Sequence, residues 1–123
     1  MSLVRWNVEA QMVEVFDEEQ HFLLHPYLEV AGWWTNSKRL LEERGYSLPT
    51  SEQLFALRNL IREVNDIIVL HFGSQLKEDW WHWTRKGPTR YGYEAVYLHN
   101  RLCRDDMEVS GRYIGRAVLD LNK

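Results

Sequence analysis

The most unusual local composition is the run Trp80-Trp81-His82-Trp83, which is followed by a basic loop and then by tyrosines. Aromatic rings beside arginines can stack sugars, bases or peptide side chains. We therefore expect a ligand-binding surface here, with three cations and Tyr91 largely exposed. Its candidate residues are Trp80, His82, Arg85, Lys86, Arg90, Tyr91 and Tyr93. The competing interpretation is a core, in which Trp81 and Trp83 point to the opposite face of a strand and cover a helix.

The histidines and the single cysteine could support catalysis. His82 and His99 both fall in predicted strands and could meet across a hairpin. Cys103 precedes Arg104 in a basic setting, which could lower the pKa of its thiol. A small enzyme using His82, His99 or Cys103 is therefore one alternative function. Cross-strand packing explains the two histidines more simply, so we assign no catalytic residue.

Two groups of side chains have partial resemblance to metal sites. His21 and His25 are four residues apart, but no glutamate follows the first histidine and Pro26 disfavours a helix. The loop carboxylates of Asp105, Asp106 and Glu108 could hold calcium, yet their spacing matches no EF-hand. No glycine-rich phosphate loop is present either. We predict no metal and no cofactor.

Charge is distributed unevenly along the chain. The net charge is −3, whereas residues 85–116 carry seven basic and four acidic side chains. A basic surface in this second half would suit a polyanion or nucleic acid, which is the second alternative function. The first thirty residues hold six acidic side chains against Arg5 alone. Neutralisation of one end by the other across a sheet is the simpler explanation, so we do not expect a nucleic-acid partner.

The chain of 123 residues predicts a single domain, 1–123, with one substantial core. One cysteine excludes an internal disulfide. No apolar run approaches the roughly 20 residues that span a bilayer, so we expect no membrane insertion. We see no signal peptide. The expected location is cytoplasmic, or virion- or surface-associated if a leader was removed.

The strongest structural pattern lies in the stretch from Tyr46 to Gly73. Apolar residues recur at three- and four-residue steps, which predicts one long amphipathic helix. Thr50 and Gln53 form a capping box after Pro49. A shorter helix precedes it, capped by Thr35 or Asn36 and stopped by Gly45.

Extended segments surround these helices. Val4 to Met12 alternates as one strand that shifts phase near Val13, and Pro26 weakens any strand across residues 21–27. Strands are also predicted at 80–84, 91–100 and 113–121, with 101–111 as an irregular charged connection. This order predicts an α+β fold in which two helices pack on one face of a mainly antiparallel twisted sheet.

Three motifs carry a resemblance to a known family. They are Gly45-Tyr46-Ser47-Leu48-Pro49-Thr50, Trp81-His82-Trp83-Thr84 and Arg116-Ala117-Val118. Together they resemble bacterial C-type-lectin-like domains of the Legionella collagen-like C-terminal and "major paralogous" groups, over about residues 33–121. The resemblance implies that strands from the two ends of the chain pair. It also implies binding through surface loops without conserved chemistry, as on bacterial surfaces or in phage receptor-binding proteins.

These observations favour a non-enzymatic ligand- or partner-binding domain for recognition or assembly. The contact surface would be the Trp80–Tyr93 hairpin with the loop from Arg101 to Arg112. The ligand is expected to be a glycan or a protein. The aromatic content is also compatible with a homo-oligomer.

Overall fold

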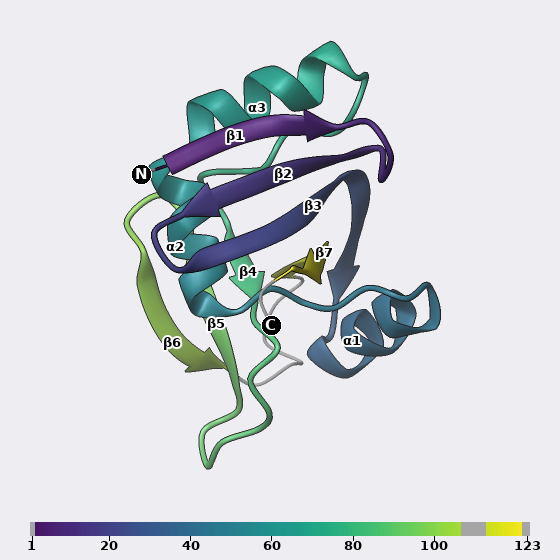
Figure 1. Cartoon of the computed structure of the whole chain (residues 1–123). Helices are drawn as coiled ribbons and strands as arrows, with labels where there is room; N and C mark the ends of the chain where they lie inside the picture. Colours follow the sequence, from purple (N-terminus) through teal and green to yellow (C-terminus); the bar gives the residue numbers. More distant parts are fainter. Residues whose placement is uncertain (1, 107–112, 122–123) are drawn as a thin grey trace.

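The computed structural model describes residues 2–106 and 113–121, which form a seven-stranded mixed sheet and three helices (Figure 1). The strands are β1 Ser2–Asn7, β2 Met12–Asp17, β3 Gln20–Gly32, β4 Trp81–Trp83, β5 Tyr93–Tyr97, β6 Leu102–Asp106 and β7 Tyr113–Asp120. The helices are α1 Trp34–Glu43, α2 Ser51–Asn59 and α3 Ile61–Leu70. The order across the sheet is β1-β2-β3-β7-β4-β5-β6. Only the β4–β7 pairing is parallel among these strands, so the predicted mainly antiparallel α+β fold is confirmed.

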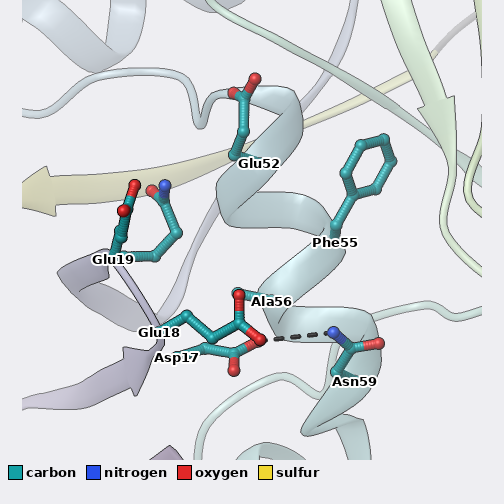
Figure 2. A pocket seen from close by; sticks show the side chains of 8 residues that line it. Asp17, Glu18, Glu19, Glu52, Phe55, Ala56 and Asn59 are labelled. Atoms are coloured by element: carbon teal, nitrogen blue, oxygen red, sulfur yellow. Dashed lines mark hydrogen bonds between the residues drawn. The ribbon is translucent and has the colours of Figure 1, made fainter.

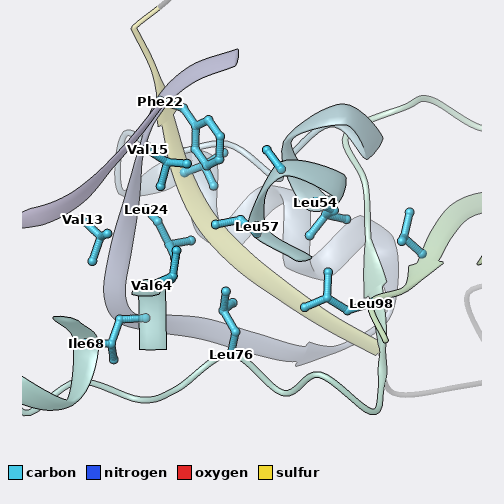
Figure 3. Packing of buried hydrophobic residues seen from close by; sticks show 13 residues of the cluster. Val13, Val15, Phe22, Leu24, Leu54, Leu57, Val64, Ile68, Leu76 and Leu98 are labelled. Carbon is cyan, nitrogen blue, oxygen red and sulfur yellow. The ribbon is translucent and has the colours of Figure 1, made fainter. Parts of the chain in front are cut away.

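Helices α2 and α3 cover one face of the sheet. The predicted apolar stripe of Leu54, Leu57, Val64 and Ile68 is buried against residues such as Val118 (Figure 3). The predicted capping box is present, because Thr50 Oγ1 accepts from Gln53 N at 3.0 Å. The helix is not continuous, however. It breaks at Leu60, so that α2 contacts β2, β3 and β5 while α3 contacts β1 and β2. A straight helix could not follow a twisted sheet in this way.

Helix α1 lies on the opposite face, so the prediction that the helices share one face is wrong. Trp81 and Trp83 point toward α1 and pack in the cluster that contains its buried Trp34 and Leu41, not against the long helical segment. Gly115 permits this close approach. A Cβ at Gly115 would lie 2.9 Å from Leu48 Cδ2 and 3.1 Å from Ser37 Cβ.

The two ends of α1 differ in how well local sequence predicts them. The predicted stop is confirmed, because Gly45 follows the helix with φ +86°. The predicted N-cap is wrong, because Trp33 occupies the cap position and makes no side-chain capping hydrogen bond. The helix start is fixed instead by Trp34, whose Nε1 donates to the carbonyl oxygen of Thr84 at 2.7 Å.

Three strand predictions also need correction. The expected strand from Val4 to Met12 is a hairpin, in which Asn7 Oδ1 accepts from Ala10 N at 2.9 Å and turns the chain. Strand β3 runs through Pro26, since its register with β7 shifts between Leu24 and Glu29 and a proline needs no ladder partner in such a bulge. The expected irregular connection contains β6, and its residues 107–111 lie outside the described part of the chain.

The strands from the two ends of the chain do not pair. β1 lies at an edge and pairs with β2, whereas β7 lies in the centre between β3 and β4. Two consecutive hairpins move the chain from the edge inward, so that β3 and not β1 presents a free edge to β7. The pairing implied by the lectin-like resemblance is therefore wrong.

Candidate functional site

The seven residues of the predicted binding surface do not share one surface. His82 has 0% of its surface exposed and lies inside the sheet. Tyr93 is half-buried and stacks on Trp34 at a centroid distance of 4.3 Å. Trp80 is largely exposed. The strand alternation predicted correctly that Trp81 and Trp83 face inward, but it could not reveal that both faces of β4 are covered.

Arg85 is half-buried, contrary to expectation, because it holds the fold together. Its guanidinium donates to both carboxylate oxygens of Asp120, at 2.5 and 2.9 Å. It also donates to the carbonyl oxygen of Leu48 at 2.8 Å and to Gln53 Oε1 at 3.2 Å. The hydrogen bond from Arg85 lowers the pKa of Asp120. Arg85 therefore fastens the α2 start to the end of β7.

Lys86, Arg90 and Tyr91 are exposed, as predicted, in the loop between β4 and β5. This loop extends well beyond the sheet (Figure 1). The Arg90 guanidinium lies 5.7 Å from the centroid of the Tyr91 ring, a cation–π contact. The predicted surface is thus reduced to one small group at a loop tip.

The residues of the enzymatic alternative do not converge. His82 and Cys103 are both paired with Val96, which therefore lies between them in the sheet. His99 lies beyond β5 and contacts Glu78 Oε1 at 3.3 Å. Burial raises the pKa of the Cys103 thiol, and nearby carboxylates, chiefly that of Glu94, raise it further. The net effect opposes the alternative in which basic neighbours activate this thiol.

Among the described residues of the basic second half, three arginines, including Arg85, are engaged within the fold. Arg104 lies over the Trp81 ring at 3.8 Å and donates to Asp106 at 2.6 Å, whereas Arg116 is fully buried. The cleft between the β2–β3 turn and α2 measures ≈590 Å³ and is acidic (Figure 2). Its carboxylates are those of Asp17, Glu18, Glu19 and Glu52. This distribution does not favour a polyanion.

A different surface, which we call the aromatic end, brings together Trp6, His25, Tyr27, His71 and Phe72. The Trp6 and His71 rings stack at a centroid distance of 3.6 Å with only 6° between their planes. A pocket of ≈460 Å³ opens beside them, lined also by His25 and Tyr27. These residues come from β1, from the bulge of β3 and from the segment after α3, which meet at one end of the sheet (Figure 1).

Three exposed apolar side chains are adjacent or nearly adjacent in sequence to residues that line this pocket. Phe72 is 97% exposed and Leu70 and Val8 are each 72% exposed. Phe72 has φ +58°, a left-handed conformation that turns the chain out of α3. Gly73 follows it, and Ser74 N donates to Pro26 O at 2.9 Å, which holds the turn against β3. Phe72 therefore projects from the end of α3 with almost its whole side chain exposed.

His25 presents a hydrogen-bond donor at the aromatic end. Its Nδ1 accepts from the backbone nitrogens of Leu28 and Tyr27, at 3.0 and 3.3 Å. A neutral ring must therefore carry its proton on Nε2. Burial lowers the pKa of His25, and Arg116 and Arg44 lower it further, so the neutral form dominates at pH 7. The pocket thus combines aromatic walls with polar side chains, namely those of His25, His71 and Gln11.

The sequence contained one signal for the aromatic end. The end of the predicted helix carries apolar residues outside the predicted stripe, namely Val69, Leu70 and Phe72, just before Gly73. The predicted fold gave these residues no surface to pack against. Trp6 and Tyr27 gave no such signal, because their proximity to His71 depends on the strand order.

Within residues 2–106 and 113–121 no three His, Cys, Asp or Glu side chains are arranged to hold a metal ion. The proposed calcium ligands bond elsewhere: Asp105 accepts from Thr89 and Asp106 from Arg104, while Glu108 lies outside the described residues. No helix in the described ranges has the length and apolar character needed to cross a membrane. No protein-family model, curated protein or solved structure matches this chain significantly.

A polar network on the α1 side of β1–β3 has a measurable consequence at low pH. Glu14 is buried, and its carboxylate accepts from Arg5, Asn7 and His21 at 3.1, 3.1 and 2.7 Å. Burial alone raises the pKa of Glu14, but the hydrogen bonds outweigh it and lower the pKa to about 2.

A depressed carboxyl pKa contributes stability above the unfolded value of 4.5, and this contribution is lost as the pH falls toward 2. We expect Glu14 to account for about 1–2 kcal/mol of the stability lost between pH 5 and pH 3. Urea unfolding of Glu14→Gln at both pH values should show a correspondingly smaller loss than the wild type. Glu43→Gln, at an exposed position, is the control and should retain the full loss.

Proposed function

We propose that this chain is a non-enzymatic protein-binding domain and that the aromatic end is its contact surface. The observation that carries the proposal is the full exposure of Phe72 beside the stacked rings of Trp6 and His71. Interface hot spots are rich in large aromatic side chains that fill pockets on the partner. A partner side chain could in turn enter the ≈460 Å³ pocket and accept a hydrogen bond from His25 Nε2.

Rigidity supports this surface over the loop at Lys86–Tyr91. The aromatic end is built from a strand, a bulge and a helix end, and Arg116 donates to the carbonyl oxygens of His25, Pro26 and Ser74 beneath it. A surface that is already ordered loses little conformational entropy on binding. The separation of His82, His99 and Cys103 supports binding rather than catalysis.

The test begins by locating the partner. Two variants of the chain are expressed in its native host, one with a photo-crosslinking phenylalanine analogue at position 72 and the other with the same analogue at position 102. Leu102 is also exposed but lies in β6, at the opposite edge of the sheet from β1. We expect a specific crosslinked protein from position 72 and none of that mass from position 102. Equal products from both positions would contradict the proposal.

The affinity for the partner is then measured with purified proteins. Phe72→Ser should weaken binding at least 30-fold in calorimetry, which corresponds to a hot-spot residue of about 2 kcal/mol. Leu102→Ser is the matched control, and should bind like the wild type. Sedimentation of the free chain shows whether the partner is a second copy. Unchanged affinity of Phe72→Ser would rule out the aromatic end.

Glycan and polyanion binding are separate outcomes of the same programme. A glycan screen and a heparin titration of the wild-type chain test them without a known partner. Binding to heparin that weakens steeply with salt would favour the basic alternative. Binding to a glycan that is lost in Tyr91→Ala but retained in Phe72→Ser would favour the loop between β4 and β5.

The lectin-like relationship is also a proposal. Its support is that Thr50 caps α2 and that two of its motifs, at residues 81–84 and 116–118, lie in or next to the neighbouring strands β4 and β7. Against it stands the position of β1 at the edge of the sheet. Only the arrangement of the loops around a bound partner would decide whether the binding mode is lectin-like.

A further inference from the structure

The sheet consists of two antiparallel groups of strands that meet at one seam. Strands β1, β2, β3 and β7 form the first group and β4, β5 and β6 the second. At the seam β4 runs parallel to β7, with His82 and Ile114 as the pair in register. Strand β4 has only three residues, and parallel pairing is slightly weaker per residue than antiparallel pairing. This connection has one residue pair in register, fewer than any other strand connection in the described sheet.

His82 occupies the centre of this seam with an unsatisfied nitrogen. Its Nδ1 lies 3.1 Å from the carbonyl oxygen of Trp80 and must donate to it. The Nε2 atom is buried and has no hydrogen-bond partner among the described residues. A proton added to Nε2 would therefore create a buried charge without an acceptor, which is a costly arrangement.

The neighbours of His82 do not offset such a charge. Val96 faces it from β5 and Ile114 from β7, and both are apolar. The charged groups whose fields reach the ring are Arg116 on β7 and Lys77 on the segment before β4, and both are cations. Arg116 is paired with Glu29 at 3.4 Å. A protonated His82 would thus face repulsion within an apolar seam.

We propose that the β4–β7 seam is an acid-sensitive joint, in which protonation of His82 releases the β4–β5–β6 group while β1, β2 and β3 remain folded. With the seam closed the ring stays neutral. With the seam open the ring is hydrated and accepts a proton freely. Acidification therefore favours the open form and uncovers Trp83, which the closed seam buries completely.

The direction and size of the effect follow from linkage. The pKa of His82 is lowered from 6.5 to about 4. Burial is the largest cause, the two cations also lower the pKa, and the hydrogen bond to Trp80 raises it by less than these together. The neutral His82 ring contributes its full stabilisation of the closed seam above pH 6.5, and this contribution is lost as the pH falls toward 4. The equilibrium constant for opening should rise about 30-fold between pH 7.5 and pH 5.0.

Hydrogen exchange of the full chain at pH 7.5 and pH 5.0, corrected for the intrinsic pH dependence of exchange, tests the joint. We expect protection of the amides in β4 and in residues 113–116 to fall about 30-fold, while protection in β1 and β2 changes less than threefold. An equal fall in every strand, or no fall at the seam, would overturn the proposal.

Variants assign the response to one histidine. His82→Leu removes the titrating group and should abolish the pH dependence at the seam. His25→Gln removes the second histidine whose pKa is lowered and should retain it, as should His99→Gln at an exposed position. A response that persists in His82→Leu would refute the assignment. If His82→Leu does not fold, the comparison of protection at the seam with protection in β1 and β2 of the wild type still decides the question.

Discussion

Replacing Arg116 with methionine should lower the free energy of unfolding by about 3–5 kcal/mol, the scale for removing one partner from a buried charge network. The side chain is fully buried. Its guanidinium donates to the carbonyl oxygens of His25, Pro26 and Ser74, at 3.0, 2.6 and 2.7 Å. Methionine preserves the apolar stem but removes three hydrogen bonds to buried carbonyl oxygens. Pro26 O keeps Ser74 N as a donor, whereas the carbonyl oxygens of His25 and Ser74 lose the Arg116 donor, and each unsatisfied group is costly.

Urea unfolding at pH 7 measures the effect. A buried ion pair can often be replaced by apolar residues without loss of stability, because both charged partners are removed together. Here most of the acceptors of Arg116 are backbone carbonyl oxygens, which no side-chain substitution removes. Arg116→Lys should recover only part of the loss, because an ammonium group cannot reproduce the planar donor geometry. Arg39→Met removes an exposed ion pair with Glu43 and should change stability by less than about 1 kcal/mol. Wild-type stability in Arg116→Met would contradict this account of the β3 bulge.

Replacing Trp83 with alanine should cost about 3–5 kcal/mol, the range for large aromatic residues in cores. Trp83 is fully buried and lies 4.7 Å from the Tyr113 ring, while its Nε1 donates to the carbonyl oxygen of Gly32 at 2.8 Å. The substitution leaves a cavity between α1 and the sheet and an unsatisfied carbonyl at the end of β3.

Two further variants separate these causes. Trp83→Phe keeps most of the ring but not the donor, and should cost clearly less than the alanine variant. Trp33→Ala removes a half-exposed tryptophan at the start of α1 and should cost about 1 kcal/mol or less. Thermal unfolding followed by far-UV circular dichroism gives the ranking. Equal losses for Trp33→Ala and Trp83→Ala would show that the cluster under α1 is not a core.

Several elements were predictable because their stabilising contacts are local. Thr50 and Gln53 bond to each other across three residues, so the start of α2 is encoded where it occurs. Gly45 ends α1 because its own backbone adopts φ +86°. The alternation of residues 91–100 predicted β5 for a similar reason, since period two is a property of a single strand.

The candidate site was less predictable than the fold, because its chemistry depends on contacts far apart in sequence. His82 and Arg85 were expected at a binding surface, yet β7 covers the first and Asp120 engages the second. Local composition identifies an arginine or a histidine but cannot state which partner reaches it.

The sequence by itself determined the N-cap of α2, the stop of α1, the periodicity of most elements and the α+β class, since each depends on interactions within a few residues. The tertiary structure decided which face each helix covers and where β7 enters the sheet. The packing of α3 on β1 places Trp6 against His71, and the strand order places Arg116 beneath His25, which is 91 residues away in the sequence. Those two contacts create the aromatic end. They join segments that are far apart in the sequence, so no short-range preference could have predicted them.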